Sequence, residues 1–221
     1  MRLTNSFQDR RSAASGFSLL EIMAVIAISL TVTVFAVMSL VPVMNQQHVT
    51  NAYNTTISAM RQARDNAISQ RTSYSVTFAN GTVPNTIVVA PTNTAFQGSL
   101  PAATYQLPPD VTFQVQSVLT SVTAPDGYGN GTAAIDFGYP APSTTVAGQT
   151  VAYFCPDGSS QNSTGAGNCS GMNYWSGGVV YLARGTDVLS FRAVTVWGGT
   201  GRLRGWRLYT KSGGGYQWFR N

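Results

Sequence analysis

A single carboxylate, Glu21, stands immediately before twenty residues, Ile22–Val41, that contain no charged side chain. A helix of about 20 residues crosses the apolar core of a bilayer, so this run is long enough to span a membrane. An acidic side chain at the edge of such a run is costly unless another group pairs with it. We therefore predict a membrane anchor whose first turn carries a functional carboxylate.

The residues before the anchor are polar, and they include Arg2, Arg10 and Arg11 against Asp9. A secretory signal contains its own apolar region ahead of the cleavage site, and that region is discarded. Here the apolar run begins only after Gly16, so cleavage at that point would keep it in the mature protein. The arginines predict a cytoplasmic leader and an exported C-terminus. The alternative is an ordinary signal anchor in which Glu21 has no function.

The helix is predicted to continue beyond the anchor, from about Phe17 to about Ser69. Pro42 ends the strictly apolar part and is expected to kink the helix, because proline removes one backbone hydrogen bond. The residues beyond it recur at three- and four-residue spacing, which is typical of an amphipathic helix. This apolar stripe consists of Val49, Ala52, Tyr53, Ile57, Met60, Ala67 and Ile68. It predicts contact with a globular head, and a partner-binding groove helix is the alternative.

The rest of the chain is predicted to form strands separated by turns. A long N-terminal helix followed only by strands predicts an α+β fold, with the helix packed on an antiparallel sheet. We expect three parts: a leader at 1–16, a helix at 17–71 with a transmembrane segment at about 17–41, and a β-rich head at 72–221. The strands are expected at Tyr74–Phe78, Thr86–Ala90, Val111–Val122, Ala133–Phe137, Val151–Phe154, Gly178–Ala183, Val188–Val196, Trp206–Thr210 and Tyr216–Phe219.

The chain has two cysteines, Cys155 and Cys169, with thirteen residues between them. The segment between them is rich in Gly, Ser and Asn and could not hold a shape through apolar packing. A disulfide would close it with a stabilisation of about 3 kcal/mol in the chain-entropy model. An oxidising compartment would allow this bond, and free thiols are the alternative. No metal site is expected, because two thiols at this spacing lack companion ligands.

Charge is distributed unevenly along the head. Between Thr72 and Ala183 there is no Lys or Arg, whereas the segment from Arg184 to Asn221 has seven basic residues and one acidic residue. Clustered arginines can neutralise phosphates, and interleaved aromatic residues can stack on bases, so DNA is one candidate ligand. A solvated basic face on a terminal hairpin is the alternative, and acidic polysaccharide, anionic lipid headgroups or an acidic partner subunit would satisfy the same charges. The candidate DNA-binding residues are Arg202, Arg204, Arg207 and Lys211.

The small residue, the phenylalanine and the acid four places later, Gly16, Phe17 and Glu21, resemble the processing site of type IV prepilins and type II secretion pseudopilins. The resemblance implies that prepilin peptidase cuts after Gly16 and that the new N-terminal Phe17 is methylated. It further implies that Glu21 pairs with the terminal amine of a neighbouring subunit and sets its register in a filament. The implied location is the bacterial inner membrane, with one membrane pass and a periplasmic head, or an assembled filament.

The segments Ile57–Ile68, Ala134–Gly138 and Val194–Arg204 resemble the GspH/FimT group of minor pilins and pseudopilins. Members named FimT act in DNA uptake through a Gly-Arg-x-Arg motif near the C-terminus, and Gly201-Arg202-Leu203-Arg204 fits this motif. The resemblance implies a subunit that assembles into, or primes, a type IV pilus or a secretion pseudopilus. Its implied partners are other pilin or pseudopilin subunits, prepilin peptidase and the inner membrane. DNA binding for natural transformation is the alternative function.

Catalytic chemistry has little support in the sequence. The single histidine, His48, lies in the predicted helix without an evident Ser or Cys partner, and there is no phosphate-binding glycine loop of the required pattern. The segment Asp126–Gly131 lacks the alternating acidic ligands of a calcium loop and is interpreted as a turn. We expect a protein that is not an enzyme and has no catalytic residues and no cofactor.

Overall fold

The computed structural model describes residues 16–93, 98–140, 149–161, 169 and 175–221. The predicted leader 1–16 therefore lies outside the described residues apart from Gly16. By its internal contacts the chain divides into two units, one ending at Val43 and one spanning Met44–Asn221. The helix α1, Leu19–Gln70, belongs to both units, and its assignment continues through Pro42.

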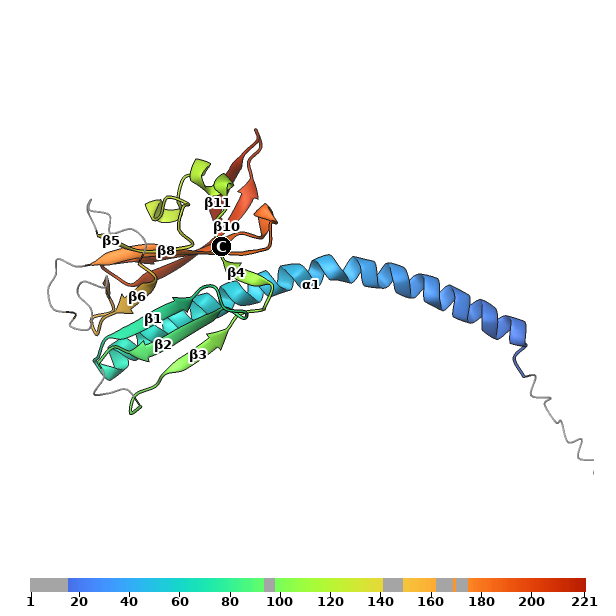
Figure 1. The fold of residues 1–221 in the computed structure, drawn as a ribbon, viewed down its shortest axis with the longest axis horizontal. Coiled ribbons are helices and arrows are strands. Elements are labelled where there is room, and N and C mark those ends of the chain that lie inside the picture. The colour runs from blue at the N-terminus through green and yellow to red at the C-terminus, as the bar shows by residue number, and fades with distance from the viewer. Residues whose placement is uncertain (1–15, 94–97, 141–148, 162–168, 170–174) are drawn as a thin grey trace, which may run out of the picture. The chain divides into compact units, whose positions relative to one another are not determined.

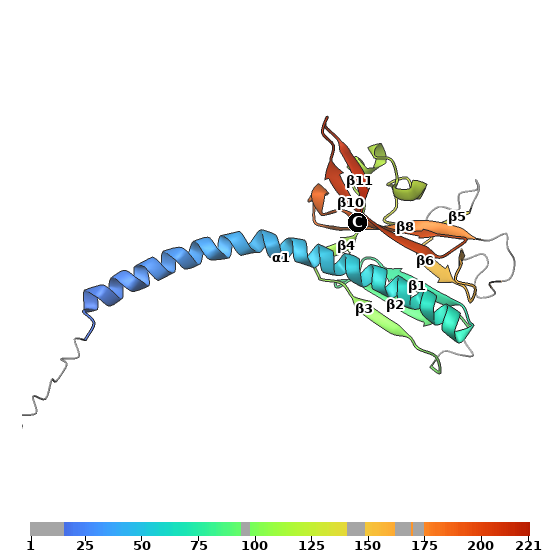
Figure 2. The ribbon, with the colours of Figure 1, turned by 180° about the vertical axis from the view of Figure 1, so that it is seen from behind.

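The fold class is α+β, as predicted: one long N-terminal helix and antiparallel sheets that pack on its C-terminal half (Figures 1 and 2). The first sheet has the order β3-β2-β1-β6-β7. Its strands are β1 (Tyr74–Ala79), β2 (Thr86–Pro91), β3 (Ala103–Gln106), β6 (Val151–Phe154) and β7 (Ser160–Gln161).

The second sheet has the order β11-β10-β9-β8-β4, and β5 pairs with the same edge of β8 as β4 does. The nine-residue strand β8 is buried on both faces and forms the centre of the head. The strands are β4 (Val111–Phe113), β5 (Ile135–Pro140), β8 (Ser176–Arg184), β9 (Arg192–Trp197), β10 (Arg202–Thr210) and β11 (Tyr216–Arg220).

Two apolar cores lie on opposite faces of the second sheet. The main core joins α1 to both sheets and contains Met60 and Ala63 of the helix together with Val180 and Leu182 of β8. The smaller core uses the alternate residues of β8, such as Tyr181, because successive side chains of a strand point to opposite faces. The strands of the second sheet thus contribute to a core on either face.

The amphipathic part of α1 buries the predicted stripe with one exception. Six of the seven stripe residues are buried, but Ile68 is 41% exposed, so its predicted place in the core is wrong. Three further residues, Thr56, Ala59 and Ala63, are fully buried. Small side chains at these positions let the helix approach the sheets closely, and the predicted stripe did not include them.

The predicted strand Val111–Val122 is wrong beyond Phe113. Ser117–Ser121 instead form a 3₁₀ helix, η2, whose Leu119 is buried in the smaller core. The hydroxyl groups of Thr120 and Ser121 donate to carbonyl groups three residues earlier, at 2.7 and 2.8 Å. Such local bonds compete with a sheet ladder, so alternation of apolar residues was not sufficient to make a strand.

The N-terminal part of the predicted strand Val188–Val196 is also not extended. Val188–Ser190 form the 3₁₀ turn η5, which Asp187 caps by accepting a hydrogen bond from the Leu189 amide at 3.0 Å. Another short 3₁₀ element, η3, spans Pro125–Gly127 and fits the predicted turn. The strands β3 and β7 were not predicted, because neither is a long apolar run.

Candidate functional site

The N-terminal candidate site lies at the start of α1. Gly16 and Phe17 precede the helix, Phe17 is 78% exposed, and Glu21 lies in the first turn. The backbone amides of Glu21 and Ile22 both donate to the Ser18 carbonyl, at 3.0 and 3.1 Å. Glu21 makes no ion pair with another described residue. Its charge is placed where the positive end of the helix dipole favours an anion.

The apolar half of α1 satisfies its own polar groups. The run Ile22–Val41 contains four hydroxyl side chains, and each donates to a carbonyl three or four residues earlier, at 2.7–2.9 Å. An unsatisfied polar group is expensive in hydrocarbon, so this pattern suits a bilayer. The helix is long and apolar enough to cross a membrane, and its most apolar window is not buried against the protein.

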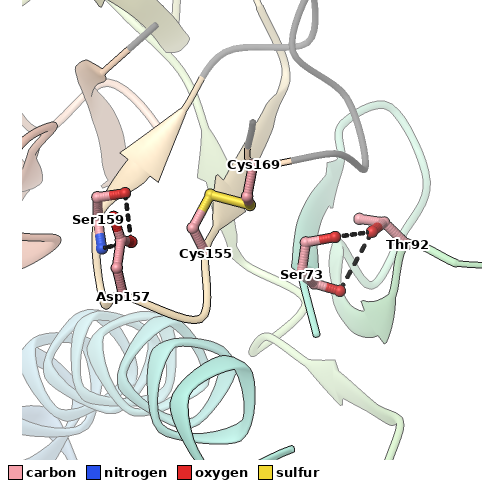
Figure 3. The surroundings of a disulfide bond; sticks show 6 residues. All are labelled: Ser73, Thr92, Cys155, Asp157, Ser159 and Cys169. Carbon is pink, nitrogen blue, oxygen red and sulfur yellow. Dashed lines mark hydrogen bonds between the residues drawn. A yellow bond between two sulfur atoms is a disulfide. The ribbon is translucent and has the colours of Figure 1, made fainter. Parts of the chain in front are cut away.

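Cys155 and Cys169 form a disulfide in the head, with 5.6 Å between their Cα atoms (Figure 3). Cys155 follows β6 directly and is 1% exposed. The turn behind it is held by Asp157, whose carboxylate accepts from the amide and the hydroxyl of Ser159 at 2.9 and 2.6 Å. A disulfide between a buried and a partly exposed cysteine is typical of a protein that folds in an oxidising compartment.

The two arginines of the Gly201–Arg204 segment have different surroundings. Arg204 forms an ion pair of 2.6 Å with Asp126, whose side chain is only 5% exposed, and stacks over Trp197 at 5.2 Å. The other oxygen of Asp126 accepts from Thr195 at 2.6 Å. Arg202, in contrast, is exposed. Arg204 is therefore committed to holding the 3₁₀ element η3 against the sheet, which leaves Arg202 as the accessible cation of the motif.

The other two candidate DNA-binding residues, Arg207 and Lys211, also differ in their surroundings. Arg207 lies opposite Arg192 in the β9–β10 ladder and stacks over Tyr209 at 5.0 Å. Arg192 is buried, and its guanidinium donates to three backbone carbonyl groups. Burial, followed by the nearby charge of Arg207, lowers the pKa of Arg192 to about 10. Lys211 is exposed on the β10–β11 turn.

The fold brings Arg202 to two arginines of α1 that the sequence analysis did not connect with it. Arg61 and Arg64 line a groove of about 470 Å³ together with Arg202. The spacing of Arg61 and Arg64 places them on one side of a helix, which was visible in the sequence. Their approach to a turn near residue 200 depends on the tertiary packing and had no signal in the sequence.

His48 has a partner that the sequence did not indicate. Its Nδ1 lies 2.9 Å from both carboxylate oxygens of Asp110, and Arg184 Nε lies 2.5 Å from one of them. Burial alone would raise the pKa of Asp110, but the hydrogen bonds from His48 and Arg184 outweigh it and hold the pKa below its usual value. The cluster connects α1 to the start of β4 and to the end of β8.

Comparison with protein-family models, with curated protein sequences and with solved structures gave no match. The class of protein can therefore be argued only from the architecture. A long apolar N-terminal helix packed on antiparallel sheet is compatible with a pilin-like fold. The length and apolarity of the helix are compatible with a single membrane pass.

Proposed function

We propose that the protein is a membrane-anchored filament subunit of the pilin and pseudopilin class, of the GspH/FimT type. The observation that carries the proposal is Glu21, a carboxylate in the first turn of a helix whose following twenty residues are uncharged. A plain anchor gains nothing from an acid at this position, whereas a filament subunit can pair it with the terminal amine of its neighbour. Such a head-to-tail contact does not close on itself and generates a helical assembly.

Two features of the rest of the molecule support this function. The hydroxyl groups of the apolar half bond within their own helix, so this half can lie in lipid or among other helices. The head carries a disulfide, which suits the periplasm or the cell surface. The proposed partners are therefore other subunits of the filament, prepilin peptidase and the inner membrane.

Processing can be tested by co-expressing the full chain with a prepilin peptidase and measuring the intact mass of the product. We expect a mature chain that begins at methylated Phe17, and we expect Gly16→Leu to block cleavage. Glu21→Ala should be cleaved normally but should be lost from sheared filaments by at least tenfold. Glu21→Asp, which keeps the charge, should retain most of the incorporation. Normal incorporation of Glu21→Ala would contradict the role assigned to the carboxylate.

Sequence-independent binding of DNA by the basic C-terminal strands is the second candidate function. The exposure of Arg202 and Lys211 favours it. The engagement of Arg204 with Asp126 removes one of the expected phosphate contacts. If DNA is a ligand, Arg202→Ala should weaken binding to duplex DNA and lower its salt dependence, whereas Arg204→Ala should mainly destabilise the head. No binding at low salt would exclude this function.

A further inference from the structure

The groove between α1 and the β9–β10 turn is a defined feature of the head. It has a volume of about 470 Å³ and receives residues from two distant parts of the chain. The helix supplies Arg61, Arg64 and Asp65, and the turn supplies Thr200, Gly201, Arg202 and Leu203. Leu203 also packs against the main core, so the groove is anchored on the rigid centre of the head.

Close backbone packing fixes the two walls of the groove. Arg64 Nε donates to the Gly158 carbonyl at 3.1 Å. Gly201 has a φ of 57°, and a Cβ atom there would lie 2.1 Å from the same Gly158 carbonyl oxygen. A glycine is therefore needed at 201 for the turn to reach this position. The turn is consequently held against the helix by backbone packing and by Arg64, so the walls of the groove are part of the folded structure.

The charges of the groove are not balanced. Its lining contains three arginines, Arg61, Arg64 and Arg202, and one acidic residue, Asp65. Among the described residues, ion pairs join other side chains, and none joins Asp65 to these arginines. Arginine forms strong charge-assisted hydrogen bonds with carboxylate and phosphate groups. An anionic group placed in the groove would therefore gain several such bonds.

Two exposed apolar side chains lie close to residues that form the walls of the groove. Trp175, which is 39% exposed, lies against Gly199, which directly precedes the lining residue Thr200. Ile68, which is 41% exposed, lies next to Gly158, whose carbonyl accepts from Arg64. Tryptophan and arginine are among the residues most enriched in the energetic centres of protein–protein interfaces. A cationic groove near an exposed tryptophan and an exposed isoleucine is thus the composition of a protein-docking surface.

We propose that the groove lined by Arg61, Arg64 and Arg202 binds an acidic segment of a partner protein, and that Trp175 and Ile68 contact the apolar residues beside its carboxylates. With Asp65 among the three arginines, the lining has a formal net charge of only +2, which one or two carboxylates can balance. A nucleic-acid backbone gains its affinity from many phosphate contacts, and most of its charge would find no partner at this groove. The inference goes beyond the function proposed above, because it requires neither processing after Gly16 nor an anchor.

The test uses the full chain in detergent micelles and a fluorescent twelve-residue peptide with two adjacent aspartates between leucines. The comparison peptide has asparagine in place of aspartate. Fluorescence anisotropy should show at least tenfold tighter binding of the aspartate peptide. The double substitution Arg61→Ala with Arg202→Ala should weaken that binding at least tenfold, because the loss of a buried interfacial charge contact mainly raises the dissociation rate. Ile68→Asp should weaken it as well.

The matched control is Arg220→Ala, which removes one exposed arginine of β11 that does not line the groove and should change affinity less than twofold. Thermal unfolding of each variant shows whether the head is intact. Equal binding of the two peptides, or binding that survives the double substitution, would overturn the proposal. Displacement of the peptide by a 20-base-pair DNA duplex that binds more tightly through Arg61 would reassign the groove to nucleic acid. None of these results affects the Glu21 experiment.

Discussion

The two halves of α1 share one helix but have different surroundings. In the first half, Ile22–Val41, the large apolar side chains are exposed, and hydroxyl groups are bonded to the same helix. In the second half, small and apolar residues such as Ala63 are fully buried against the sheets. The difference teaches that apolar residues in one continuous helix serve two purposes, contact with lipid or other helices and formation of a core. The two purposes are distinguished by where polar residues occur around the helix.

The largest expected difference between the halves concerns two methionines. Met60 is fully buried, whereas Met38 is 69% exposed. Met60→Ala should lower the free energy of unfolding of the head by about 2–5 kcal/mol, because it leaves a cavity in the main core. Met38→Ala should change it by less than about 0.5 kcal/mol. Urea unfolding followed by tryptophan fluorescence would measure both free energies. Equal losses of stability in the two variants would contradict the division of α1 into an exposed half and a core-forming half.

A smaller effect is expected where the second half of α1 meets β10. A Cβ atom at Gly205 would lie 1.5 Å from the hydroxyl oxygen of Tyr53. Gly205→Ala should therefore destabilise the head by about 1–3 kcal/mol through overpacking. Gly213→Ala is the matched control, because a Cβ atom at that position meets nothing within 4 Å. Combining Gly205→Ala with Tyr53→Phe should recover part of the loss, and no recovery would mean that another contact is responsible.

The smallest expected effect concerns the ion pairs that connect the second half of α1 to the sheet. The pKa of Asp110 is held below its usual value by His48 and Arg184. A carboxyl group with a lowered folded pKa stabilises the protein above its unfolded pKa, and this contribution is lost as pH falls through the folded pKa. The contribution should be about 1 kcal/mol or less, because the groups are partly exposed to solvent.

The measurement for this last prediction is the unfolding free energy from pH 6 down to pH 3. The wild-type protein should lose stability below about pH 4, and Asp110→Asn should be less stable at pH 6 and less sensitive to acid. A pH dependence that is unchanged in Asp110→Asn would assign the acid sensitivity to another carboxylate.

Local patterns in the sequence predicted much of the fold. The helix was expected from about Phe17 to Ser69 and spans Leu19–Gln70, because its periodicity extends over many turns. Strands such as β6 were found at the predicted residues, since short β-branched and aromatic runs between turn residues favour them. The region after Phe113 was misjudged, because the hydroxyl groups of Thr120 and Ser121 bond locally and form a 3₁₀ turn.

The sequence by itself determined those features that depend only on residues close together in the chain. A run of twenty uncharged residues after Glu21 defines a potential anchor, and two cysteines define the possible covalent link. The tertiary structure decided which charges are available to a ligand. Arg202 and Arg204 are two residues apart in the sequence, yet a buried Asp126 neutralises one of them and the other joins Arg61 and Arg64. The reason is that charge pairing depends on distance in space, which chain separation does not specify.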